Sequence, residues 1–290
     1  MKIAIDIREA DGEKTGKGYY TYGLVSEILK QDQENQYILY TNSHKNPFLA
    51  QQNVKLRTIE ASGFKWHWRT LQDLKVEMPD LYFSPTSFII PAMAPKSLKT
   101  IITVHDLVAF LFPKNHNKKA VLIERMTLKM AIKKASKIFV VSENTQNDLI
   151  QLFALPQSIM AEIPCAPNDK YRVEIKANDV EKIKKKFKLP EHYLLAVGTL
   201  EPRKNFINLI KAFVIVKRKF PDYKLVIVGK KGWKHKAIDE AVVEYGVAED
   251  VIFPGYMKDN ELHVAYHAAS VFVFPSLYEG FGIPPLEAMA

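Results

Sequence analysis

The stretch YLLAVGTLEPRKNFINLIKAFVIVKRKFPDYKLVIVG, residues 193–229, decides the fold of this chain. It opens with an apolar run at 193–200 and closes with another at 224–229, and a helical pattern over 205–219 separates them. Continuously apolar strands joined by a helix are typical of parallel sheets that helices cover on both faces. The stretch therefore predicts a parallel strand–helix–strand unit.

The same alternation continues on both sides of this unit. Downstream we predict strands at 251–255 and 270–276 and helices at 235–245 and 259–268. Upstream, we predict strands at 2–7, 36–41, 54–59, 80–85, 100–106 and 137–142 and helices near 18–30, 66–75, 117–135 and 143–152. The pattern loosens between Cys165 and Pro190, which favours a domain boundary there. The prediction is an α/β protein with two doubly wound domains, residues 1–168 and 169–290.

Composition narrows the class of protein. With 290 residues, 47% of them hydrophobic, the chain can form two packed cores. The single cysteine excludes an intrachain disulfide, and the start MKIAIDI is typical of a strand and not of a signal peptide. No stretch approaches the ~20 apolar residues of a membrane-spanning helix. We therefore expect a cytoplasmic protein.

The formal net charge of +9 leaves three kinds of partner open: nucleic acid, an anionic membrane surface, or an anionic substrate. Residues 114–137 hold eight Lys/Arg against Glu124 alone, and this segment is either a solvated helix face or a membrane-facing amphipathic helix. Leu122, Met126 and Met130 recur there at helical spacing, so peripheral contact with the inner face of a membrane is one expectation. The one basic and aromatic stretch, FKWHWR at 64–69, is either a nucleic-acid motif or a loop that packs on the domain, and we expect no nucleic-acid partner.

The first candidate site follows the strand at 193–200. Arg203 and Lys204 come just before a predicted helix, and ligands bind at the carboxyl ends of strands in open parallel sheets. Cations beside the free N–H groups of a helix N-terminus favour an anion such as phosphate. A solvated Arg–Lys pair is the alternative.

The second candidate site is the turn LYEGFGIPPLE, residues 277–287. Glu279 lies on the predicted loop and Glu287 in the first turn of a helix that Pro284 and Pro285 open. A carboxylate can accept hydrogen bonds from two neighbouring hydroxyls, which suits a sugar diol, and Gly280 and Gly282 allow close backbone approach. A solvated Glu279, with Glu287 serving the helix dipole, is the alternative.

Two further candidates lie in the first half. Gly16 and Gly18 open a helix after the first strand and form either a phosphate loop or a plain Gly-rich turn. His105 ends a strand, where it either donates to a ligand or is a hydrogen-bonded core histidine. The sequence has no Asp-x-Asp and no Cys or His cluster with metal spacing, so we expect neither a metal site nor a cofactor, and cationic side chains would carry the charge of a bound diphosphate.

Together these stretches resemble retaining, nucleotide-sugar-dependent glycosyltransferases of family 4. The stretches that carry the resemblance are TGKGYYTYGL (15–24), VHDL (104–107), VSENTQNDL (141–149), GTLEPRKNFINLIKAF (198–213), LVIVGKKGW (225–233), VIFPGY (251–256) and FPSLYEGFGIPPLEAMA (274–290). The last contains two glutamates separated by seven residues, and PRKN is most similar to the mannosyltransferase-like branch.

The resemblance implies a GT-B fold: two facing Rossmann-like domains, an acceptor side at 1–168 and a nucleotide-sugar side at 169–290, with the active site in the cleft. It implies that a hexose such as mannose moves from a nucleotide-diphosphate sugar, a substrate and not a cofactor, to a glycan or lipid-linked acceptor in polysaccharide biosynthesis. Each candidate residue takes a role by the same resemblance. Arg203 and Lys204 hold the diphosphate, Glu279 faces the donor sugar, Glu287 binds ribose, Gly16 and Gly18 approach the diphosphate, His105 lies near the leaving group, and Gly280, Phe281 and Gly282 line the donor site.

Two features depart from the family pattern. Tyr19 stands where many relatives have an arginine after Gly-x-Gly, which removes one expected phosphate contact. Relatives also continue well beyond the helix that carries Glu287, so we expect a second domain that is incomplete and a truncated chain that binds donor poorly. A non-catalytic sugar-nucleotide-binding fragment or scaffold is therefore the alternative to an active transferase.

Overall fold

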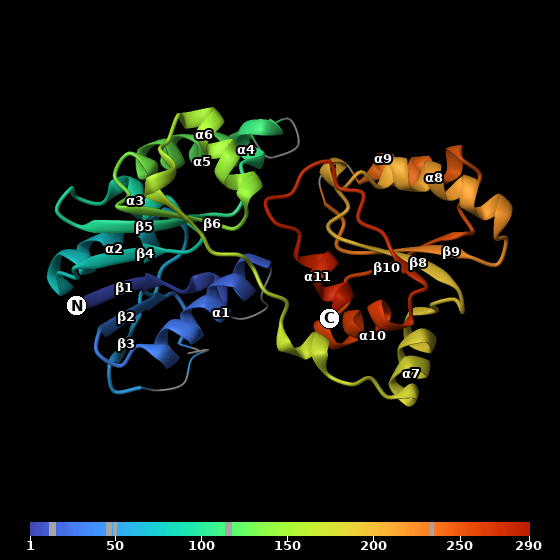
Figure 1. Cartoon of the computed structure of the whole chain (residues 1–290), viewed down its shortest axis with the longest axis horizontal. Helices are drawn as coiled ribbons and strands as arrows, with labels where there is room; N and C mark the ends of the chain where they lie inside the picture. Colours follow the sequence, from blue (N-terminus) through green and yellow to red (C-terminus); the bar gives the residue numbers. More distant parts are fainter. Residues whose placement is uncertain (12–15, 45–47, 49–50, 114–117, 233–234) are drawn as a thin grey trace. The chain divides into compact units, whose positions relative to one another are not determined.

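The computed structural model describes residues 1–11, 16–44, 48, 51–113, 118–232 and 235–290. These residues cluster into two compact units, one ending at Ala166 and the other running from Pro167 to Ala290. Each unit is built on its own parallel sheet (Figure 1). The predicted α/β class with two Rossmann-like domains is thereby confirmed.

The sheet of the first unit has the strand order β3-β2-β1-β4-β5-β6-β7, all parallel. Its strands are β1 (Lys2–Asp6), β2 (Gln36–Thr41), β3 (Val54–Thr58), β4 (Leu81–Ser84), β5 (Lys99–Val104), β6 (Lys137–Val140) and β7 (Met160–Glu162). The order of the first six strands is that of the dinucleotide-binding Rossmann fold, in which the winding direction reverses between β1 and β4.

Helices cover both faces of this sheet. The α-helices are α1 (Gly16–Gln31), α2 (Gly63–Glu77), α3 (Ile89–Met93), α4 (Val108–Leu111), α5 (Lys118–Ile132) and α6 (Glu143–Phe153), and a 3₁₀ turn η1 (Arg8–Ala10) follows β1. On one face, Val25 and Leu29 of α1 pack against Ile5 and Leu39. The helices α2, α5 and α6 pack on the opposite face. Strand residues therefore alternate between two cores, as the continuous apolar runs predicted.

The second unit repeats the winding with fewer strands. Its sheet has the order β10-β9-β8-β11, all parallel. The elements are η4 (Asp169–Arg172), α7 (Ala177–Phe187), β8 (Tyr193–Val197), η5 (Pro202–Lys204), α8 (Phe206–Lys219), β9 (Lys224–Val228), α9 (Lys236–Glu244), β10 (Val251–Gly255), α10 (Asp259–Ala268), β11 (Val271–Phe272) and α11 (Ile283–Met289). Helices α8 and α9 cover one face and α10 the other (Figure 1). The winding reverses between β8 and β11, which are neighbours.

The predicted strand at 270–276 is shorter than expected. Strand β11 spans Val271–Phe272. One further backbone hydrogen bond follows it, from Val273 N to Leu195 O at 2.7 Å. Pro275 has no N–H to donate, and the chain then turns so that Leu277 N donates to Arg203 O at 2.9 Å. The residues that were expected to extend the strand instead contact the loop that follows β8.

Two glycines let the loops at this end of the second sheet approach each other. Gly229, directly after β9, has φ +159°, and a Cβ built on it would lie 1.9 Å from the carbonyl oxygen of Gly198. No real Cβ tolerates that distance, so the position requires glycine or a shift of the backbone after β8.

We expect Gly229→Ala to lower the free energy of unfolding of the second unit by at least about 2 kcal/mol, because the methyl group collides with backbone. Gly23→Ala is the control, since a Cβ there has nothing within 4 Å and lies inside α1. That change should be neutral or stabilise by up to about 1 kcal/mol. Calorimetric unfolding measures both, and an unchanged transition for Gly229→Ala would contradict the close approach of these loops.

Candidate active site

The candidate site of the second unit lies where its sheet reverses direction. Strands β8 and β11 are neighbours although about 75 residues separate them in the chain, because β9 and β10 continue on the other side of β8. The loop after β8 carries Arg203 and Lys204, and the loop after β11 carries Glu279. Such reversal points, at the carboxyl ends of strands, are where ligands bind in open α/β sheets.

These three side chains form one ion-pair cluster. Arg203 Nη1 lies 2.5 Å from Glu279 Oε2, and Lys204 Nζ lies 2.5 Å from Glu279 Oε1. Arg203 Nη2 also contacts Glu201 Oε1 at 2.7 Å, and Arg203 Nη1 donates to the carbonyl of Tyr278 at 2.9 Å. The cluster therefore joins two cations and two carboxylates across the two loops, and its formal charge is zero.

Burial makes this cluster more than a surface ion pair. The side chains of Arg203, Lys204 and Glu279 are 15%, 11% and 18% exposed. Burial by itself raises the pKa of Glu279, but Lys204 and then Arg203 outweigh it and hold that pKa below the usual range. For Arg203, burial lowers the pKa and the two carboxylates, Glu279 first, more than restore it. At neutral pH Glu279 is a carboxylate that both cations stabilise.

The backbone around Arg203 and Lys204 is fixed by neighbouring residues. Asn205 has φ +60°, a left-handed conformation that asparagine adopts more readily than most residues, and its side-chain amide donates to Pro275 O at 3.0 Å. The stem of Lys204 lies over Gly198, where a Cβ would come within 3.1 Å of Lys204 Cε. The two loops are therefore joined by backbone and side-chain contacts as well as by charge.

One polar atom of the cluster is not satisfied. Arg203 Nε is buried and has no hydrogen-bond partner within the described part of the chain. A buried donor without a partner costs on the order of 1–3 kcal/mol. A rearrangement that gave this nitrogen a hydrogen-bond acceptor would therefore stabilise the buried guanidinium.

Glu287 has different partners from the other three predicted residues. It is the fifth residue of α11 and lies in the second turn, not in the first as predicted, because that helix begins at Ile283. The hydroxyl of Tyr266, on α10, donates to Glu287 Oε2 at 3.0 Å. Burial raises the pKa of Glu287, and hydrogen bonds from Tyr266 and then Tyr171 oppose that shift without cancelling it. The second-turn position and the Tyr266 contact replace the helix-dipole interpretation.

Gly282 determines the shape of the turn before α11. Gly282, at the N-cap of α11, has φ +99°, and a Cβ there would lie 3.4 Å from the ring of Phe274. Gly280 is buried, and Phe281 is half-buried. The turn therefore needs Gly282 for its left-handed backbone.

In the first unit, His105 follows β5 and is held by its neighbours. Its Nε2 lies 2.8 Å from the carbonyl oxygen of Pro85, and its ring meets that of Tyr20 edge-on with centroids 4.8 Å apart. Burial, and then the charge of Lys17, lower the pKa of His105 to about 4. The imidazole is therefore neutral at pH 7. Because a carbonyl can only accept, Nε2 carries the proton and Nδ1 is left as an acceptor.

Gly16 and Gly18 both lie in the first turn of α1, with Gly16 exposed and Gly18 buried. The preceding residues of the predicted phosphate loop, 12–15, lie outside the described residues. Helix α1 begins at the carboxyl edge of the first sheet, the edge that also carries His105. Both glycines and His105 thus occupy the end of the sheet at which ligands bind in this class of fold.

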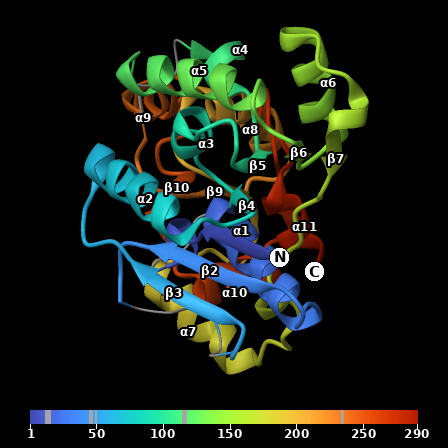
Figure 2. The same ribbon diagram turned by 90° about the vertical axis from the view of Figure 1, so that its left-hand side faces the viewer.

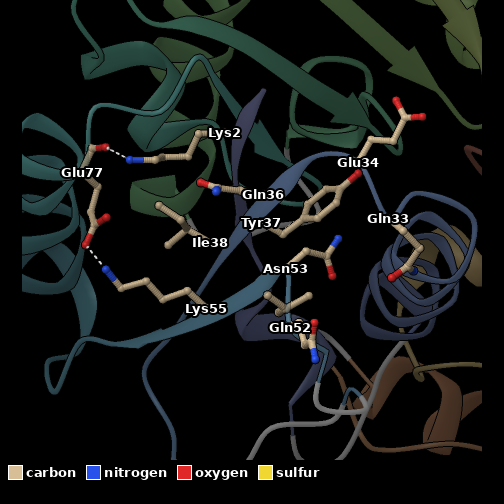
Figure 3. A pocket seen from close by; sticks show the side chains of 11 residues that line it. Lys2, Gln33, Glu34, Gln36, Tyr37, Ile38, Gln52, Asn53, Lys55 and Glu77 are labelled. Carbon is tan, nitrogen blue, oxygen red and sulfur yellow. Dashed lines mark hydrogen bonds and ion pairs between the residues drawn. The ribbon is translucent and has the colours of Figure 1, made fainter.

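A pocket of about 670 Å³ lies at the opposite edge of the first sheet (Figure 3). Lys2 donates to the backbone carbonyl of Glu77 and Lys55 pairs with its carboxylate, as the dashed lines of Figure 3 show. The lining comes mainly from the amino ends of β1, β2 and β3. None of the predicted site residues lines it, and ligands of parallel sheets bind at the other ends of the strands. We therefore place the candidate site in the ion-pair cluster and not in this pocket.

Three residues of the site were not predicted from sequence. Glu201 binds Arg203, Asn205 ties the loop after β8 to the loop after β11, and Tyr266 binds Glu287. For Glu201 a signal was available, since an acid two residues before the arginine can reach it. The contacts of Asn205 and Tyr266 depend on the pairing of β8 with β11 and on the packing of α10, and no local pattern encodes them.

Two models of known families match the chain. The model described as Glycosyltransferase Family 4 matches residues 16–169, and the one described as Glycosyl transferases group 1 matches residues 178–290. The chain therefore belongs to glycosyltransferase family 4. This confirms the family that the sequence motifs indicated.

Similarity to individual proteins supports this assignment. The chain is 32% identical over 194 residues to the O-antigen chain mannosyltransferase B of Escherichia coli, covering 66% of this chain and 51% of that protein. It thus spans about half the length of that relative. Among solved structures, sucrose-phosphate synthase from Thermosynechococcus elongatus has a TM-score of 0.72 at 19% identity, over 99% of this chain and 78% of that one. Anabaena HepE, in complex with UDP-glucose, has a TM-score of 0.71 at 17% identity, over 100% and 78%. These structural likenesses support the fold.

Opposite pH dependences should distinguish the two glutamates. The pKa of Glu279 is lowered in the folded protein, so its stabilisation is present above the ordinary glutamate pKa of about 4.3 and is lost as pH falls through the folded value. The pKa of Glu287 is raised, so its contribution is complete below about 4.3 and is lost as pH rises through the folded value.

We therefore expect Glu279→Gln to lower the free energy of unfolding at pH 7 by about 1–3 kcal/mol. Glu287→Gln, which keeps an acceptor for Tyr266, should be neutral or stabilising at pH 7 and should lose any such gain by pH 4. Thermal unfolding of both variants between pH 4 and 7.5 provides the measurement. If the stability of the two variants changed with pH in the same way, the direction assigned to one of the two pKa shifts would be wrong.

Proposed function

We propose that this protein transfers a hexosyl group from a nucleoside diphosphate sugar to a hydroxyl of a glycan or lipid-linked acceptor, with retention of anomeric configuration. The observation that carries the proposal is the cluster of Arg203, Lys204 and Glu279 at the reversal point of the second sheet. It combines two cations, which suit a diphosphate, with a carboxylate, which suits sugar hydroxyls. Family membership supports the same reaction class.

The chemical demand of the reaction fits these side chains. When the bond between the sugar and the nucleotide breaks, negative charge develops on the departing β-phosphate. Arg203 and Lys204 are largely removed from water, where fixed cations stabilise such charge more strongly than in solution. In the proposed mechanism they stabilise the leaving group. The acceptor hydroxyl attacks the face from which the nucleotide departs and gives its proton to the departing phosphate oxygen.

The ion pairs of Glu279 give this site a way to recognise both halves of the donor. The Glu279 carboxylate contacts both cations that a diphosphate would use. We infer that the diphosphate takes over these contacts and that Glu279 then accepts hydrogen bonds from the donor sugar. A diphosphate oxygen would also offer an acceptor to the guanidinium of Arg203, whose Nε lacks one among the described residues.

Glu287 is suited to the ribose of the donor. Its Oε2 accepts the Tyr266 hydrogen bond, which fixes the carboxyl group in one orientation. Tyr171 also hydrogen-bonds to this carboxyl group, and the lone pairs that the two tyrosines leave can accept from a ribose hydroxyl. In the first unit, we propose that the neutral His105 accepts a hydrogen bond from a sugar hydroxyl through Nδ1, since Nε2 is held by Pro85, and that Gly16 and Gly18 approach the diphosphate.

The names of two relatives suggest the transferred sugar, the acceptor and the place of action. The E. coli relative and RfbU of Salmonella typhimurium, which is 33% identical over 193 residues, are both named O-antigen chain mannosyltransferases. We therefore propose mannose as the transferred sugar, a polysaccharide precursor as the acceptor, and action at the cytoplasmic face of a membrane. Because the sequence has no Asp-x-Asp, we propose that Arg203 and Lys204, and no metal ion, carry the charge of the diphosphate.

Substitution of the two cations tests the proposal. A first screen of GDP-, UDP- and ADP-sugars by thermal protection identifies the donor, and we expect GDP-mannose to protect best. With that donor, Arg203→Ala and Lys204→Ala should each lower the transfer rate by about 10²–10³. Lys219→Ala, an exposed lysine at the far end of α8, is the matched control and should leave the rate unchanged.

The outcomes separate the two parts of the proposal. Donor protection without any turnover would indicate a binding protein and not an enzyme. Unchanged rates for both Arg203→Ala and Lys204→Ala would show that the site has been wrongly assigned.

A further inference from the structure

Two helices of the first unit expose large apolar side chains together with cations. On α2, Phe64 and Trp68 are 64% and 52% exposed and lie one turn apart. The opposite side of the same helix is buried, with Trp66 fully inaccessible and Leu74 in the core. Lys65 and Arg69 alternate with the exposed aromatic residues and are exposed as well. The exposed side of α2 is therefore aromatic and basic.

Helix α5 has the same character with aliphatic side chains. Leu122, Met126 and Met130 recur every four residues and are 59%, 57% and 46% exposed. Lys129 and Lys133 are exposed beside them. The buried side of α5 consists of other residues, among them Leu128 and Ile132. The exposed apolar residues of α5 therefore do not contribute to the core.

Strand register places these two helices on the same face of the sheet. Ala4, which packs under α2, pairs in register with Tyr82, and Tyr82 pairs with Thr100. Ile102 lies two residues beyond Thr100, so it faces the same side, and it packs under α5. Helix α3 lies between α2 and α5 and contacts both (Figure 2). The exposed sides of α2 and α5 therefore belong to one helical layer, which we call the α2–α5 surface.

The α2–α5 surface is positively charged. It carries Lys65, Arg69, Lys129 and Lys133, whereas the acids of α2 that could neutralise it, Asp73 and Glu77, pair with Arg57 and Lys55 outside the exposed stripe. Each lysine or arginine near an anionic lipid surface strengthens binding to that surface. Phe, Trp, Leu and Met beside such cations are the side chains that enter the lipid interface.

We propose that the α2–α5 surface docks this protein on an anionic lipid bilayer. Phe64, Trp68, Leu122, Met126 and Met130 enter the interface, and the cations contact lipid phosphates. Among the described residues no helix is long and apolar enough to span a bilayer, and this mode of binding needs none. Nucleic acid is a poorer fit, because its phosphates and bases offer no site for the aliphatic side chains of α5.

The docking surface has a consequence for the reaction. Helices α2 and α5 both begin at the carboxyl edge of the parallel sheet. Phe64 lies in the first turn of α2, and Trp68 and Leu122 lie in the second turns of their helices. His105 follows β5 at the same edge. A bilayer on the α2–α5 surface would thus adjoin the edge of the first unit that carries His105. This places a lipid-linked acceptor close to that edge without a membrane-spanning segment.

Co-sedimentation with vesicles tests the proposal on the full chain. One set of vesicles is phosphatidylcholine alone, and the other contains about a third phosphatidylglycerol. We expect binding to the anionic vesicles, with a blue shift of the tryptophan emission that Trp68→Phe removes without preventing binding. Leu122→Gln/Met126→Gln/Met130→Gln should weaken binding at least tenfold, and Lys129→Gln/Lys133→Gln should weaken it on anionic vesicles about 10–30-fold.

The controls change the same residue types elsewhere. Ile215→Gln removes an exposed apolar side chain of α8, and Lys219→Gln removes an exposed charge, and neither should change vesicle binding. Failure to bind anionic vesicles would overturn the proposal, as would equal binding by all variants. The proposal would also fail if Phe64→Ala/Trp68→Ala abolished a strongly salt-dependent affinity for RNA while vesicle binding remained intact.

Discussion

The ion pairs of Glu279 with Arg203 and Lys204 are the interaction on which the site of this protein depends. They form because β8 and β11 are neighbours in a sheet whose winding reverses between them. Residues about 75 positions apart thereby meet at the carboxyl ends of adjacent strands. Two further features support this meeting: the left-handed Asn205, and Gly198, which lies under the stem of Lys204.

A neutral, largely buried charge cluster has two consequences for function. The ion pairs hold Arg203 and Lys204 in fixed orientations, and both cations have Glu279 as a partner. A bound diphosphate would then replace the Glu279 carboxylate as the anion that Arg203 and Lys204 contact. Buried ion pairs are often retained for reasons other than stability, and preorganisation of the leaving-group site is the reason we propose here.

The sequence was informative wherever the chemistry follows from position along a strand. Arg203, Lys204 and Glu279 were predicted because each comes after an apolar run, and the rule for parallel sheets brings such residues to one edge. Glu287 was expected in the first helical turn and lies in the second, because α11 begins at Ile283. The hydrogen bond from Tyr266 could not be foreseen, since it requires α10 and α11 to be packed together. Nor did FKWHWR indicate which of its aromatic side chains are exposed, since the burial of Trp66 and the exposure of Trp68 depend on how α2 packs on the sheet.

A double-mutant cycle on Lys204 and Glu279 is the most direct test of the central interaction. Lys204→Met, Glu279→Gln and the double variant are compared with the wild-type protein by equilibrium unfolding at pH 7. If the two side chains form a largely buried ion pair, their effects should be non-additive, with a coupling energy of at least about 1 kcal/mol. Effects that add to within about 0.5 kcal/mol would show that the two residues act independently, and the account of the site would then be wrong.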